Sequence, residues 1–254
     1  MNFDKKEAVR YLGYKGVEPD ADMSALIDRC GEELLSVITP RNTWVECSLS
    51  FLKNETNRTF HEKGLVRNEE QTEHGISAGV DESTIEGRTS GSAVTDILQI
   101  EDMVIQSRNL YRNLKGCEKV VLFAATLGLE ADRLIARKTA VRMSEAVIYQ
   151  AAAAAIIETY CDEINEEIRL HYEKEGFFLR PRFSPGYGDV ALSHQKDFCR
   201  LLNASKKIGL TVTEGDLMVP IKSVTAVIGL SKQNSDCHKK GCEECDKKNC
   251  EFRR

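Results

Sequence analysis

A segment rich in proline and glycine carries the side chains with the clearest capacity for binding chemistry. It reads Arg182-Phe183-Ser184-Pro185-Gly186-Tyr187-Gly188-Asp189. Pro185 fixes its own φ and keeps Ser184 extended, so no helix can continue through this segment. The planar guanidinium of Arg182 suits a carboxylate or a phosphate, and Gly186 allows the backbone to approach a ligand closely. These residue types predict a small-molecule site, although a plain connecting loop is the alternative.

Four cysteines near the C-terminus form a second candidate site. The pattern is Cys-x4-Cys-x2-Cys-x4-Cys, at Cys237, Cys242, Cys245 and Cys250. Four thiolates this close in sequence can converge on one metal centre, and the neighbouring lysines favour the thiolate form. Structural zinc sites usually pair two Cys-x2-Cys knuckles and this tail has one, so an iron–sulfur cluster is slightly favoured over zinc. The alternative is a tail of uncoordinated, reactive thiols.

The composition of the chain limits the classes of protein to which it can belong. The 254 residues carry a formal net charge of −5, and this acidic balance argues against nucleic-acid binding, which usually needs a basic surface. No apolar run approaches the ~20 residues that span a bilayer, and the N-terminus lacks the apolar core of a signal peptide. The cysteines outside the tail stand singly in apolar segments, as buried reduced cysteines do. We therefore expect a cytoplasmic protein.

Apolar residues at helical or alternating spacing must supply the scaffold that positions these candidate sites. The predicted helices lie at residues 4–12, 23–38, 101–115, from about 130, and 143–174. The predicted strands lie at residues 45–51 and 120–125 and, as a pair, between 210 and 230. Asp20 or Asp22 is the expected cap of the second helix, and Ser193 that of a further helix containing Phe198.

The mixture of elements predicts an α+β fold with an antiparallel or mixed central sheet and several packed helices. We expect residues 1–94 to be the N-terminal part of one domain, 95–231 its ligand-binding core, and 232–254 a cysteine-rich metal-binding tail. Residues 54–92 are polar and without a clear pattern, so a mobile hairpin and an ordered loop near the ligand are both open. The Gly-x-Gly-x-x-Gly spacing of dinucleotide-binding folds is absent.

The candidate loop resembles one from a known family. Its Arg182-x-x-Pro185-Gly186-Tyr187 motif is similar to the Arg-x-x-Pro-Gly-Tyr loop of the activation domain of cobalamin-dependent methionine synthase. In that family the loop holds S-adenosylmethionine, and its arginine meets the methionyl carboxylate. The likeness extends over about residues 95–231 and places Glu158 where the family has a glutamate that faces the cofactor.

The resemblance implies an activation domain-like fold with an S-adenosylmethionine site. The cofactor would contact Glu158 and the loop residues Arg182, Phe183, Ser184, Pro185, Gly186 and Tyr187. As a free-standing activation subunit, the chain would present S-adenosylmethionine for the reductive methylation of cob(II)alamin, a methyltransferase reaction of methionine biosynthesis. The partner would be a cobalamin-binding methionine synthase subunit or another corrinoid protein, with a flavodoxin- or ferredoxin-type electron donor. No residue of the chain is expected to act as a general base.

The cysteine tail departs from this family, whose typical activation domain has no such segment. The Cys242-x2-Cys245-x4-Cys250 spacing resembles that of some iron–sulfur modules, including one in corrinoid proteins of one-carbon metabolism. Two alternatives therefore stay open. Instead of an activation subunit, the chain could be a metal-cluster redox or interaction protein that keeps the fold but not the S-adenosylmethionine site, or an interaction module stabilised by zinc.

Overall fold

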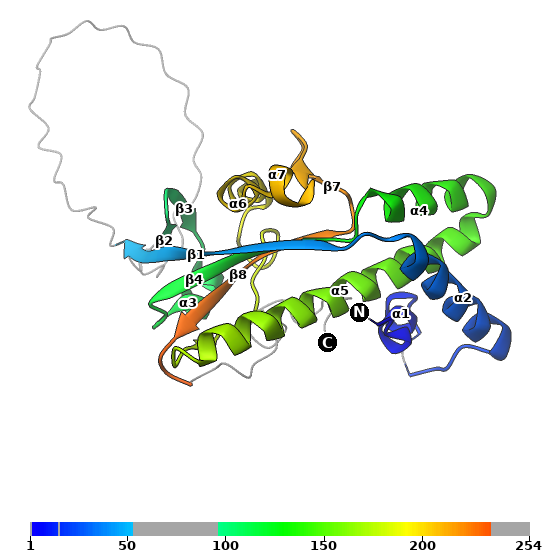
Figure 1. Ribbon diagram of the computed structural model, residues 1–254, viewed down its shortest axis with the longest axis horizontal. Coiled ribbons are helices and arrows are strands. Elements are labelled where there is room, and N and C mark those ends of the chain that lie inside the picture. The colour runs from blue at the N-terminus through cyan, green and yellow to red at the C-terminus, as the bar shows by residue number, and fades with distance from the viewer. Residues whose placement is uncertain (1, 15, 53–95, 235–254) are drawn as a thin grey trace, which may run out of the picture.

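A six-stranded antiparallel sheet forms the centre of the molecule (Figure 1). In this computed structural model the described residues are 2–14, 16–52 and 96–234. The strand order is β3-β2-β1-β4-β8-β5. The strands are β1 (Arg41–Leu52), β2 (Ile97–Ile100), β3 (Met103–Gln106), β4 (Lys119–Thr126), β5 (Phe178–Leu179) and β8 (Ser223–Ser231). The prediction of an α+β fold is confirmed, and the sheet is antiparallel.

The sheet is the middle of three layers because its central strand is apolar on both faces. In β4, Val121 and Phe123 face one core while Val120 and Leu122 face the other, as the two-residue period of a strand requires. The first core is covered by α1 (Lys5–Tyr11), α2 (Ala21–Val37), α4 (Leu129–Val141) and α5 (Met143–Glu173). The second core is covered by α3 (Arg108–Leu114), α6 (Gln195–Leu202) and α7 (Ala204–Ile208). Figure 1 shows α5 on one side of the sheet and α6 and α7 on the other.

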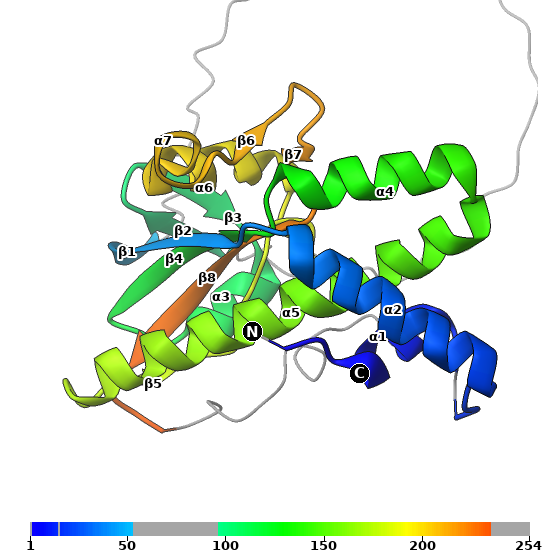
Figure 2. The ribbon, with the colours of Figure 1, turned by 45° about the vertical axis from the view of Figure 1, so that its right-hand side comes forward.

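The longest helix, α5, is the main support of the first layer, and its predicted range of 143–174 is confirmed. Four of the five alanines between Ala151 and Ala155 are buried, and such small side chains allow close packing of the elements that contact this helix, which include α1, α2, α4, β4 and β8. Figure 2 shows α1, α2 and α4 gathered around the N-terminal half of α5. No helix in the described ranges, α5 included, combines the length and the apolar character that crossing a membrane would need.

Residues 101–115 do not form one helix, contrary to the prediction. Glu101 and Asp102 form the turn of the hairpin between β2 and β3, and α3 begins only at Arg108. Glu101 has a φ of 53°, which is uncommon for a residue other than glycine. Its carboxylate accepts a hydrogen bond of 2.6 Å from the N–H of Ser48 on β1. This turn contains neither glycine nor proline, and Asp102 alone is a weak turn signal.

Two predictions for the C-terminal part also differ from the structure. Ser193 lies in a short 3-10 turn, η1 (Leu192–His194), and its side chain does not cap α6. The segment from 210 to 230 contains three strands instead of two. Of these, β6 (Thr211–Val212) and β7 (Met218–Val219) pair with each other in a small hairpin, and β8 joins the main sheet.

Candidate functional site

The candidate loop follows an edge segment that runs beside β8. Beyond β5, the N–H of Arg180 donates to the carbonyl of Gly229 at 2.8 Å. Phe183 and Val227 then exchange two backbone hydrogen bonds of 2.9 and 2.8 Å. Phe183 packs against the core beneath α6, so the preceding residue, Arg182, projects to the opposite face of the sheet, where α5 lies.

The guanidinium of Arg182 meets two carboxylates of α5. Its Nη2 lies 2.7 Å from Oδ1 of Asp162 and 3.3 Å from Oε2 of Glu158. The two acids are four residues apart and therefore lie on one face of the helix. The other terminal nitrogen of Arg182, Nη1, is buried and has no hydrogen-bond partner among the described residues. The arrangement leaves one strong donor of the fork unsatisfied.

The tip of the loop is a tight turn that exposes its backbone and one aromatic ring. The N–H of Gly186 donates to the carbonyl of Val190 at 2.9 Å, and the N–H of Tyr187 donates to the carbonyl of Ser184 at 3.1 Å. Gly186 has a φ of 89°, which side chains other than glycine rarely adopt. Pro185 is buried beneath the turn, whereas Tyr187 is 61% exposed. The loop thus presents bare backbone and an aromatic ring to solvent.

Asp189 fastens the far end of the loop to the start of α3. Its carboxylate accepts hydrogen bonds from the hydroxyl of Ser107 and, at 2.8 Å, from the N–H of Arg108. Burial alone would raise the pKa of Asp189, but these bonds and one from the N–H of Asn109 outweigh it and hold the pKa below its ordinary value. A negative charge at the first turn of a helix is also favourable. The loop motif alone does not predict this role of Asp189.

The thiol of Cys161 lies behind the charged cluster and does not add reactivity to it. Burial raises the pKa of Cys161 to about 12, and the nearby Arg182 offsets this effect only in part. A thiol that stays protonated is a weak nucleophile. The cluster therefore suits the recognition of a charged ligand and not covalent catalysis by the protein.

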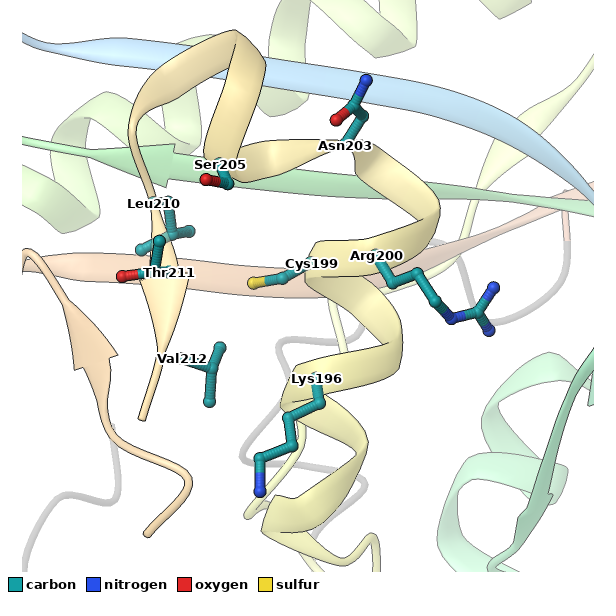
Figure 3. A pocket seen from close by; sticks show the side chains of 8 residues that line it. All are labelled: Lys196, Cys199, Arg200, Asn203, Ser205, Leu210, Thr211 and Val212. Carbon is teal, nitrogen blue, oxygen red and sulfur yellow. The ribbon is translucent and has the colours of Figure 1, made fainter. Parts of the chain in front are cut away.

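A separate open pocket lies in the opposite layer, between α6, α7 and β6 (Figure 3). Its volume is about 410 Å³. Its two cations are already engaged, because Lys196 lies 3.0 Å from the carboxylate of Asp216 and Arg200 lies 2.9 Å from that of Asp102. Burial raises the pKa of the Cys199 thiol in this pocket to about 11. The pocket therefore offers neither an unpaired cation nor an activated thiol.

Comparison with known proteins identifies the fold. The sequence matches no protein-family model and no curated protein. Among solved structures the chain is similar to the "Crystal Structure of the MetH Reactivation Domain bound to AdoHcy", with a TM-score of 0.51 and 15% sequence identity. The chain has the MetH reactivation-domain fold. The similarity covers 89% of this chain and 73% of that one, and at this identity it shows the fold alone.

Within the reactivation-domain fold, the structure brings together the site residues predicted from two distant segments. Arg182, at the base of the loop, reaches Glu158 on α5, and Phe183, Ser184, Pro185, Gly186 and Tyr187 continue from it. The predicted role of these residues in binding a cofactor stays a prediction. Asp162 was missed as a partner of Arg182, because it stands in a run of acids typical of a solvated helix face. Its place one helical turn after Glu158 is the signal that could have found it.

The predicted metal ligands Cys237, Cys242, Cys245 and Cys250 lie outside the described residues. Within the described part of the chain, there is no group of three or more histidine, cysteine, aspartate or glutamate residues that could hold a metal ion. The metal centre in the tail therefore stays a prediction from the cysteine spacing.

Proposed function

We propose that this chain binds S-adenosylmethionine beside Arg182 and presents it to a cobalamin-bearing partner for reductive methylation of the corrinoid. The observation that carries this proposal is the meeting of Arg182 with Glu158, next to a Pro-Gly-Tyr loop whose Gly186 and Tyr187 are exposed, in a reactivation-domain fold. The related structure, which shares that fold, has AdoHcy bound. AdoHcy is the demethylated form of the proposed ligand.

The residues of the site fit the amino-acid end of S-adenosylmethionine. The guanidinium of Arg182 is the donor for the methionyl carboxylate. Glu158 is an acceptor for the ammonium group and lies within hydrogen-bonding range of the same guanidinium. Gly186 is exposed and has a φ that glycine adopts readily, so its backbone can lie close to the adenosine part. Phe183, Ser184 and Pro185 hold this surface in place, and Tyr187 lies at its exposed edge.

The task of the chain in this proposal is positioning. S-adenosylmethionine supplies an electrophilic methyl group, and the reduced corrinoid of the partner supplies the nucleophile. The protein then needs no base or nucleophile of its own, which agrees with the protonated state of the Cys161 thiol. The partner would be a methionine synthase subunit or another corrinoid protein, and a flavodoxin or ferredoxin would deliver the electron.

Calorimetric titration of the anaerobically purified chain with S-adenosylmethionine tests this proposal. Saturable binding is expected, and Arg182→Ala should weaken it at least tenfold, because a charge-assisted bidentate pair to a carboxylate is lost. Arg169→Ala is the matched control, since Arg169 also pairs with two acids on α5 and stands about two helical turns beyond Asp162. Absence of binding by the unaltered chain, or equal binding by both variants, would refute the proposal.

A second candidate function is carried by the four cysteines of the tail. A metal-cluster redox or interaction protein could keep the reactivation-domain fold without binding S-adenosylmethionine. Such a protein would be purified with bound metal and would show no heat of binding when titrated with S-adenosylmethionine. Substitution of Arg182 would leave its metal content unchanged. The same titration, with metal analysis of the same sample, separates the two functions.

A further inference from the structure

Asp162 is the part of the charged cluster to which the proposed function gives no role. Its carboxylate is nearer to Nη2 of Arg182 than that of Glu158, at 2.7 Å against 3.3 Å. Its side chain is 63% exposed, whereas the side chains of Arg182 and Glu158 are 21% and 27% exposed. The nearest anion of the guanidinium is therefore also the one with the most freedom to move into solvent.

The balance of charge determines which ligands this cluster can accept. One guanidinium faces two carboxylates, so the three side chains together carry a net negative charge. A ligand carboxylate that approached Arg182 while Asp162 stayed in place would add a third anion, which Coulomb repulsion disfavours. A ligand with cationic groups of its own relieves this repulsion. S-adenosylmethionine carries an ammonium and a sulfonium beside its carboxylate, whereas S-adenosylhomocysteine lacks the sulfonium and is neutral overall.

We infer that Asp162 is a resident counter-ion of Arg182 which an α-amino acid ligand must displace, and that it makes the site prefer ligands of net positive charge. This inference rests on the proposed function, because it requires the amino-acid end of a ligand to bind at Arg182. After displacement, Asp162 remains on the same face of α5 as Glu158, where its charge still attracts a cation. Asp162 thus sets specificity through Arg182 and does not take part in chemistry.

The test compares two ligands that differ in the sulfonium methyl group alone. Kd values of the full chain are measured by calorimetry for S-adenosylmethionine and S-adenosylhomocysteine, with Asp162→Asn beside the unaltered protein. Asp162→Asn removes an exposed ion pair that the ligand would otherwise have to break. S-adenosylhomocysteine binding should therefore tighten by up to about fivefold, which corresponds to an ion-pair contribution of about 1 kcal/mol. S-adenosylmethionine binding should change less. The variant lacks the Asp162 carboxylate that competes for Arg182, but it also lacks the charge that attracts the sulfonium. The preference for the charged ligand therefore falls.

Two further variants make the result specific to the contact with Arg182. Glu167→Gln removes the same charge from another exposed position of α5 and should leave the ratio of the two Kd values unchanged. Asp162→Glu restores the carboxylate and should restore most of the preference. If Asp162→Asn leaves the ratio as in the unaltered chain, or weakens S-adenosylhomocysteine binding, the inference is wrong while the proposed function stands. If the unaltered chain binds neither ligand, both are overturned.

Discussion

Arg182 combines two satisfied contacts with one unsatisfied donor. An unpaired buried donor costs roughly 1–3 kcal/mol, whereas partly exposed ion pairs such as those to Asp162 and Glu158 contribute about 0–1 kcal/mol. The arrangement is therefore a poor way to stabilise the fold. A ligand carboxylate could offset this cost by satisfying the donor, but the guanidinium would have to move to reach it, because Nη1 is buried. The energetics at this residue favour a binding role over a structural one.

Asp189 is expected to act as the anchor of the loop, and its removal tests this. Asp189→Ala should lower the free energy of unfolding by about 1 kcal/mol, because the first N–H groups of α3 lose an acceptor while Ser107 still caps the helix. Asp22→Ala is the control, since Asp22 is exposed in the first turn of α2, which Asp20 caps. If urea unfolding gave equal free energies of unfolding for Asp189→Ala and the unaltered protein, Asp189 would not anchor the loop.

The same anchor should weaken in acid. Because the folded-state pKa of Asp189 lies below the ordinary value of 3.8, its contribution is fully present above that value and is lost as the pH falls through the folded-state pKa. The difference in unfolding free energy between the unaltered protein and Asp189→Ala should then be constant near neutrality and shrink below about pH 4. Urea unfolding monitored by circular dichroism over this pH range measures it. A difference that grows on acidification would show that the carboxylate destabilises the loop.

At the scale of single residues, the loop motif could be recognised in the sequence, but the first partner of its arginine could not be derived from spacing; only once Glu158 is placed does the four-residue spacing point to Asp162. Asp162 and Glu158 are both acids on a charged helix, and nothing in their local pattern says which of them faces the sheet edge. Glu158 was found through resemblance. Asp162 was found only when the folded chain placed Arg182 beside it.

At the scale of elements, a long apolar periodicity was sufficient to predict a helix or strand, whereas short segments with weak patterns were not predicted. β4 and α5 were predicted within a few residues because each has a long, consistent apolar pattern. The hairpin of β2 and β3 was missed because its strands have four residues each and its turn uses Glu101 in place of glycine. Short strands gain their order from pairing with β1, which lies far away in the sequence.

The close packing around α5 is expected to depend on its small buried side chains, and enlarging one of them tests this. Ala153 is fully buried, so Ala153→Leu should destabilise the fold by roughly 1–3 kcal/mol through overpacking. Ala136→Leu on the exposed side of α4 is the matched control and should change stability little. Urea unfolding curves of the two variants give the comparison. Equal midpoints would mean that α5 has room to shift away from β4 and β8.

At the scale of the whole molecule, the N-terminal segment is expected to be inseparable from the ligand-binding core. β1 lies between β2 and β4, with antiparallel pairing to both. A chain that begins at residue 95 would lose this strand together with α1 and α2, and would expose unpaired edges of β2 and β4. We expect it to aggregate or to lack near-ultraviolet circular dichroism. A chain ending at residue 234 keeps every described strand and should remain folded. A folded, soluble 95–234 fragment would disprove the prediction.

The cysteine tail is expected to add a metal centre to this fold without being part of its core. Replacement of Cys237, Cys242, Cys245 and Cys250 by alanine should reduce the bound metal from about one centre per chain to none, because thiolates are its only predicted ligands. Inductively coupled plasma mass spectrometry and the visible spectrum of anaerobic protein distinguish brown iron–sulfur protein from colourless zinc protein. The thermal midpoint should stay close to that of the unaltered chain, since both apolar cores lie within residues 2–234. Metal-free unaltered protein would refute the centre. If the cysteine variant lost S-adenosylmethionine binding together with the metal, the tail would instead be needed for ligand binding at Arg182.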